Sequence, residues 1–64
     1  MKFITKIEDK YVEAEIKDSK VIISICSTLF LEDPEVVMIL NERELKSLIQ
    51  FLKGVYYIFK GTKS

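Results

Sequence analysis

The chain offers few side chains that could carry chemistry. Its 64 residues include one cysteine, Cys26, and no histidine, so it can form neither a thiol–imidazole pair nor an ordinary zinc site. Glu13 and Glu15 fall on the same side of an alternating stretch. General acid–base catalysis needs carboxylates in contrasting environments, and nothing in the sequence supplies them. We therefore predict that the chain is not an enzyme, with no catalytic residue, no metal ligand and no cofactor, and that Cys26 is a small packing residue.

Two groups of charged residues remain as candidate binding sites. Glu32, Asp33 and Glu35 form an acidic loop that lacks the spacing of a calcium loop, which is typical of a solvated turn. A basic group with one aromatic ring falls on one side of the predicted sheet. These residues could contact a small anion, an acidic partner or nucleic acid, and the alternative is that they are simply solvated: Lys2, Lys6, Tyr11, Lys17 and Lys20.

Composition limits the class of protein. Ten basic and ten acidic residues give a net charge of zero, which argues mildly against nucleic-acid binding. No apolar run reaches the roughly 18–20 residues of a membrane span, and the charged N-terminus is unlike a signal peptide. We predict a cytoplasmic protein without a membrane partner. One domain covers residues 1–64, and its core is marginal for its size, so we predict self-association, most simply as a homodimer.

Alternating apolar and polar residues predict strands in the first half of the chain. Residues 2–8 and 11–17 alternate, and residues 20 to about 28 are rich in valine and isoleucine. Two polar pairs, Asp9-Lys10 and Asp18-Ser19, separate these strands as tight hairpin turns. One side of the resulting sheet is apolar and forms the predicted core face: Phe3, Ile7, Val12, Ala14, Ile16, Val21, Ile23 and Ile25.

These turns also fix which polar residues lie opposite one another. Lys6 should pair with Glu13 as a surface ion pair. Lys2, Lys17 and Lys20 should form one row at an end of the sheet, where like charges repel unless an anion or acidic group lies nearby.

The second half of the chain predicts one more strand and a helix. Pro34 marks a turn, and residues 35–40 then form a fourth strand. Asn41 and Glu44 have the spacing of a capping box, so a helix should run from Glu42 to about Lys60 and cover the core face. Gly54 leaves open the alternative that the helix ends there and residues 55–59 form a strand. The helix stripe, defined by i, i+3 and i+4 spacing, is Leu45, Leu48, Ile49, Leu52, Val55, Tyr56 and Phe59.

The predicted helix is apolar over a wider arc than one sheet needs. We interpret the extra apolar residues as a contact with a second copy or another partner. The alternative is that the edge of the sheet or the loop at 28–34 covers them. These candidate interface residues are Phe51, Val55, Tyr57 and Ile58.

The order of elements resembles a known family. Three antiparallel strands followed by VVMILNERELKSLIQFL, together with KVIISI in the third strand, resemble the single-stranded-DNA-binding domain of the transcriptional coactivator positive cofactor four. The resemblance covers roughly residues 11–54. It implies a four-stranded sheet with a C-terminal helix, dimers formed through the helix, and single-stranded DNA on the sheet. Members of the family carry basic and aromatic residues across the sheet and a longer loop before the fourth strand. This chain departs from them, because Glu13 and Glu15 lie on the open face and the loop is the short, acidic LEDPE.

The sequence thus predicts an α+β fold: a four-stranded antiparallel meander with one C-terminal helix packed on one face (ββββα), as a homodimer. The function we favour is a non-enzymatic binding module that occupies a partner stoichiometrically, as an inhibitor or adaptor of the kind that phages and mobile elements encode against proteins of an infected bacterial host. The alternatives are single-stranded nucleic-acid binding and sequestration of a small anionic ligand at a dimer interface. Salt dependence separates them, because phosphate contacts weaken steeply as salt rises.

Overall fold

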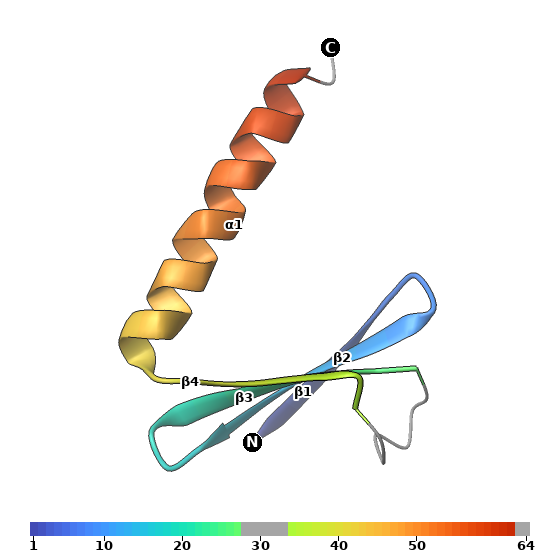
Figure 1. The fold of residues 1–64 in the computed structure, drawn as a ribbon, viewed down its shortest axis with the longest axis vertical. Coiled ribbons are helices and arrows are strands. Elements are labelled where there is room, and N and C mark those ends of the chain that lie inside the picture. Colours follow the sequence, from blue (N-terminus) through green and yellow to red (C-terminus); the bar gives the residue numbers. More distant parts are fainter. Residues whose placement is uncertain (28–33, 63–64) are drawn as a thin grey trace.

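The computed structural model describes residues 1–27 and 34–62, which form four strands and one helix (Figure 1). The order of elements is β1 (Lys2–Ile7), β2 (Lys10–Lys17), β3 (Lys20–Cys26), β4 (Val36–Leu40) and α1 (Glu42–Thr62). Neighbouring strands pair antiparallel in the order β1-β2-β3-β4. The predicted α+β class and its ββββα order are therefore confirmed.

The two hairpins differ in how well the sequence predicted them. The turn at Asp18 and Ser19 lies where expected, and both residues have positive φ angles, 51° and 61°. Two such residues give a turn whose twist matches that of the strands. The first turn is formed by Glu8 and Asp9 instead of Asp9 and Lys10, with Glu8 at φ 57°. The register of β1 on β2 is consequently shifted by two residues from the prediction.

The shift leaves the division of the sheet into two faces unchanged, because side chains alternate with a period of two. We call the side toward α1 the inner face. Among its strand positions only Thr5 and Lys10 are polar. The outer face mixes charged and apolar residues. The apolar residues of the inner face are Phe3, Ile7, Val12, Ala14, Ile16, Val21, Ile23, Ile25, Val36, Met38 and Leu40.

A capping box joins the sheet to the helix. The Glu44 backbone N–H donates to Asn41 Oδ1 at 2.8 Å, and the Asn41 backbone N–H donates to Glu44 Oε1 at 2.9 Å. These bonds satisfy backbone donors that the first helical turn leaves unpaired. The helix continues through Gly54 to Thr62 without interruption, so the alternative of a fifth strand at 55–59 is wrong.

The helix does not lie along the inner face as the sequence predicted. It meets the sheet at its first turns, next to β3 and β4, and then extends away (Figure 1). Leu45 and Leu48 are half-buried, and no residue of α1 is fully buried. The physical reason is the connection. Only Asn41 separates β4 from α1, which leaves no loop long enough to fold the helix back over the strands.

The described part of the chain consequently has almost no core of its own. Its buried residues are Cys26, 1% exposed, and Glu13, 8% exposed, and both lie on the outer face. The radius of gyration is 13.6 Å, whereas a compact domain of 64 residues has about 10.7 Å. Within residues 1–27 and 34–62, no helix is both long enough and apolar enough to cross a membrane.

Candidate functional site

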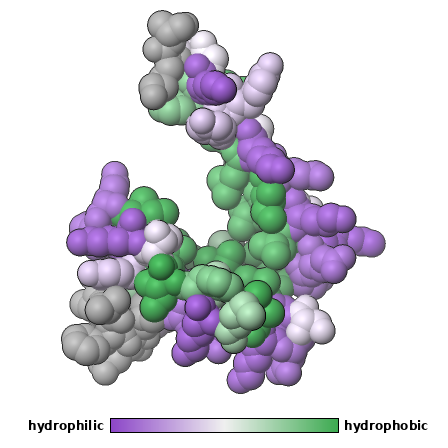
Figure 2. Space-filling view, turned by 180° about the vertical axis from the view of Figure 1, so that it is seen from behind, coloured by the Kyte–Doolittle hydropathy of each residue, from purple (hydrophilic) through white to green (hydrophobic). Residues whose placement is uncertain are grey.

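A large apolar hollow lies between the helix and the sheet. Figure 2 shows hydrophobic side chains lining this angle, with hydrophilic ones gathered on the far side of the helix. We define the hollow by the inner face on one side and by the helix stripe on the other. Phe3, Ile16 and Met38 of the inner face are exposed, as are Leu52 and Phe59 of the stripe. Exposed apolar patches of this extent mark sites of association.

The candidate interface residues of the helix separate into two groups. Val55 belongs to the helix stripe, and Phe51 and Ile58 extend the stripe around one side of α1; all three are exposed. We call Phe51 and Ile58 the helix flank. Tyr57 is 79% exposed and lies on another side of the helix, where it lines a shallow pocket with Lys60 and Gly61. The flank is therefore continuous with the hollow, and Tyr57 is not.

A polar cluster lies at one end of the inner face. Lys10 Nζ donates to Glu35 Oε1 at 2.8 Å and to Ser27 Oγ at 3.1 Å, and the Ser27 hydroxyl donates to Glu35. The Lys10 and Ser27 hydrogen bonds lower the pKa of the Glu35 carboxyl, and the hydrogen bond to Glu35 raises the pKa of Lys10. Sequence reasoning missed this cluster because it placed Lys10 in a turn and Glu35 in a solvated loop.

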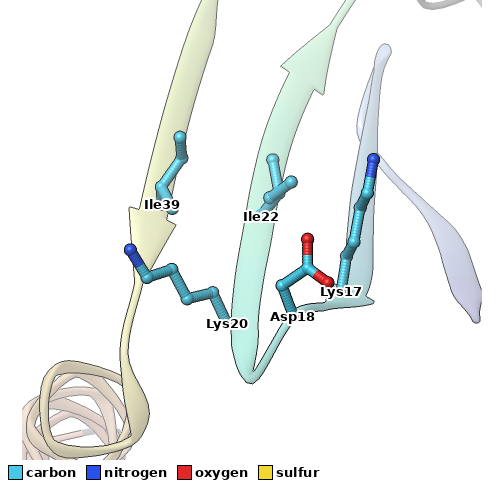
Figure 3. Close-up of a pocket in the computed structure, with 5 residues that line it drawn as sticks. All are labelled: Lys17, Asp18, Lys20, Ile22 and Ile39. Atoms are coloured by element: carbon cyan, nitrogen blue, oxygen red, sulfur yellow. The ribbon is translucent and has the colours of Figure 1, made fainter.

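The outer face carries an open pocket at the β2–β3 turn. Its volume is about 470 Å³ and its lining is Lys17, Asp18, Lys20, Ile22 and Ile39. Figure 3 shows Lys17 and Lys20 on opposite sides of the turn, the Asp18 carboxylate between them, and the two isoleucines on the strands beyond. Lys17 and Lys20 are directly opposite in the register, as predicted. The pocket thus combines two ammonium groups, one carboxylate and an apolar wall.

The other basic candidates do not join this pocket. Lys2 lies opposite Glu15 rather than in a row with Lys17 and Lys20, and its ammonium is 3.9 Å from Glu13. The predicted row of three lysines is therefore wrong, and so is the pairing of Lys6 with Glu13. Both errors follow from the two-residue shift of the first hairpin.

Lys6 pairs instead with the aromatic residue of the candidate set. It lies opposite Tyr11, and its ammonium is 5.7 Å from the centre of the tyrosine ring. This is within the range of a cation–π contact. A nucleic-acid base that stacked on this ring would have to displace the lysine.

Cys26 lies opposite Tyr11 in the pairing of β2 with β3, and it is buried. Loss of solvent raises the pKa of its thiol, and the carboxylates of Glu13 and Glu35 raise it further. A thiol with a raised pKa is a poor nucleophile at neutral pH, because the thiolate is the reactive form.

Two of the acidic candidates, Glu32 and Asp33, lie outside the described residues. Among the residues that are described, no three histidine, cysteine, aspartate or glutamate side chains gather closely enough to hold a metal ion. Comparison of the chain with protein-family models, with curated proteins and with solved structures finds no match in any of the three.

Proposed function

We propose that this chain is a non-enzymatic binding module that acts by occupying a partner stoichiometrically, as an inhibitor or adaptor. The contact surface for that partner is the outer face around the β2–β3 turn. The partner presents an acidic group beside an apolar one, and the setting is the cytoplasm, where an element such as a phage acts on proteins of its host.

The observation that carries this proposal is the pocket of about 470 Å³ with two lysines at its rim. Lys17 and Lys20 supply more positive charge than Asp18 neutralises, so the pocket attracts a carboxylate or phosphate. Ile39 is 60% exposed in the wall and can contact an apolar group of the same partner. Such a mixture of apolar area and charge is typical of interfaces that form between separately folded proteins.

The rest of the outer face suits the same role. Val37 of β4 and Ile4 of β1 are both exposed, and they lie in one row across the sheet with Ser24 and Glu13 between them. Lysine ammonium groups at the rim of an interface raise the association rate and select partners of opposite charge. The chain would then act through affinity and not through a reaction.

The experiment that tests this function compares two charge reversals. Immobilised chain captures proteins from an extract of the native host, and the captured partner is titrated by calorimetry. We expect one partner per chain, with binding lost in Lys20→Glu and kept in Lys53→Glu, an equivalent reversal on the helix. Equal binding by both variants would contradict the assignment to the outer face.

The same pocket favours a second candidate function, which is capture of a small anionic ligand. Its volume lies within the range of about 300–1,000 Å³ that is usual for such sites. Titration with ATP, followed through the amide signals of Lys17 and Lys20, tests this candidate. Saturable shifts that disappear in Lys20→Glu would favour it over a protein partner.

A labelled single strand of about 20 nucleotides separates both candidates from nucleic-acid binding. Its fluorescence anisotropy is measured at about 50 and about 200 mM salt. We expect little binding at either concentration, because Glu13 and Glu15 lie on the outer face and Lys6 covers the Tyr11 ring. Tight binding that collapses at the higher salt would instead support the activity that the family resemblance implies.

A further inference from the structure

We propose that a second copy of this chain fills the hollow. The α1 helix of the second copy lies on the inner face of the first copy, and α1 of the first copy lies on the inner face of the second. This proposal goes beyond the binding of a partner at the outer face, because it concerns the opposite side of the sheet and a different occupant.

The exposed area is of the size that a stable dimer covers. The chain exposes 5651 Å², whereas a compact monomer of 7.5 kDa exposes about 4,200 Å². The excess is about 1,400 Å² per chain, so two chains that covered it would bury about 2,800 Å² in total. Obligate homodimers bury roughly 2,000–5,000 Å², and their interfaces are apolar like a divided core.

The dimensions of the inner face fit one helix of the second copy. Four strands about 4.8 Å apart span about 14 Å, and a helix with its side chains is about 10 Å wide. The 21 residues of α1 extend about 31 Å, which exceeds the roughly 26 Å of β2, the longest strand. One helix laid across the inner face would therefore cover most of its apolar residues.

The first copy cannot supply that helix itself. Leu45 and Leu48 anchor the first turns of α1 near β3 and β4, and the capping box of Asn41 and Glu44 fixes the direction in which the helix leaves. A second copy offers a helix to this sheet and a sheet to this helix in one contact. Such a reciprocal contact is closed by two-fold symmetry and leaves neither apolar surface uncovered.

The width of the apolar arc on α1 agrees with this arrangement. Successive residues of a helix are about 100° apart around its axis. The apolar arc of α1, from Ile58 on one side to Ile49 on the other, therefore spans about 180°. A helix that packs against one neighbour has an apolar stripe of roughly 100°. In the dimer each helix has two neighbours. The helix stripe packs on the sheet of the other copy, and the helix flank packs on the other helix.

Two neighbouring residues of β4 provide a matched test. Met38 faces the hollow and Val37 faces the other way, yet both are exposed in the single chain, at 36% and 50%. A carboxylate at Met38 would be buried without a partner in the dimer. We expect Met38→Glu to raise the dimer dissociation constant at least about 100-fold. We expect Val37→Glu to change this constant less than about threefold. Light scattering during size-exclusion chromatography measures the mass of each variant over a range of concentrations.

The helix provides a second matched pair. Leu52, 53% exposed, lies in the helix stripe, and Tyr57 lies outside it. We expect Leu52→Glu to dissociate the dimer and Tyr57→Glu to leave it intact. Circular dichroism of each variant shows whether the chain still folds.

A measurement on the unmodified chain keeps the proposal testable if Met38→Glu and Leu52→Glu unfold. Isotope-labelled and unlabelled chains are mixed, and only contacts between copies are recorded by filtered nuclear Overhauser spectroscopy. We expect contacts from Leu52 and Val55 of one copy to Ile23 and Met38 of the other. Contacts between helices alone, or none at all, would overturn the proposal.

The two proposals fail in different ways. A monomer at every concentration would overturn this inference and leave the outer-face tests unaffected. A dimer whose Lys20→Glu variant keeps its captured partner would overturn the proposed function and leave this inference standing.

Discussion

Removal of the Asn41 cap should destabilise the helix by a predictable amount. Asn41→Ala deletes the Oδ1 acceptor of the 2.8 Å bond from the Glu44 N–H and leaves that donor without a protein partner. Loss of an N-cap costs about 1 kcal/mol of unfolding free energy. For a domain of this size, that loss lowers the melting temperature by about 4–8 °C. Asn41→Asp retains an acceptor and should stay close to the unmodified chain.

The assay is thermal unfolding followed by far-UV circular dichroism, with every variant at the same protein concentration because association adds to stability. Glu44→Ala and the double variant complete a thermodynamic cycle. The two residues bond to each other, so the double variant should lose less than the sum of the single losses. The reasoning is refuted if Asn41→Ala melts at the same temperature as Asn41→Asp, or if the two losses simply add.

Three further predictions concern the sheet. Ser19→Gly should raise the melting temperature by several degrees. Ser19 has a φ of 61°, and glycine adopts this conformation without the cost of about 1 kcal/mol that other residues incur. An unchanged or lower melting temperature would contradict the assigned turn. Glu35→Gln should flatten the loss of stability in acid. The Glu35 carboxyl has a lowered pKa in the folded chain, so its ionised form stabilises the fold. This stabilisation is present at pH values above the ordinary carboxyl pKa, and it is lost as the pH falls through the lowered pKa. Melting curves at several acidic pH values measure this, and an equally steep loss in the variant would contradict it. Cys26 should react with a disulfide reagent at least about tenfold more slowly in the folded chain than in denaturant, because it is buried and the pKa of its thiol is raised. Equal rates would show that the thiol is accessible in the folded chain.

The sequence predicted the strands and their faces well because alternation is a strong signal. It placed the second hairpin at Asp18 and Ser19 correctly. It placed the turn of the first hairpin one residue too late, which shifts the register of β1 on β2 by two residues. This shift keeps every side chain on its own face, so the apolar pattern cannot distinguish the two registers. What favours the observed register is pairing of individual residues: Lys2 approaches Glu13, and Lys6 lies over Tyr11.

The sequence also predicted the helix and its cap. Asn41 and Glu44 form the expected reciprocal bonds, and the apolar spacing continues through Gly54 as one helix. The direction of the helix could not be predicted, because the hydrophobic pattern says which side of a helix is apolar and not what covers it. The apolar residues that were expected to form a core within one chain instead line an open hollow.

The candidate binding residues were only partly predictable. Lys17 and Lys20 were found together because they flank a turn that the sequence identified, whereas Ile39 entered the pocket through the pairing of β3 with β4. Long-range pairing of this kind is not encoded in local spacing. The bonds of Lys10 to Ser27 and Glu35 escaped detection for the same reason.

The most direct test of the central claim is the mass of the unmodified chain in solution. Sedimentation equilibrium over a wide range of protein concentration gives this mass without a label or a substitution. We predict twice the 7.5 kDa of one chain, because in the proposed dimer a second copy covers both the inner face and the helix stripe. A mass of one chain at every concentration would contradict the account, since the hollow would then remain open to water.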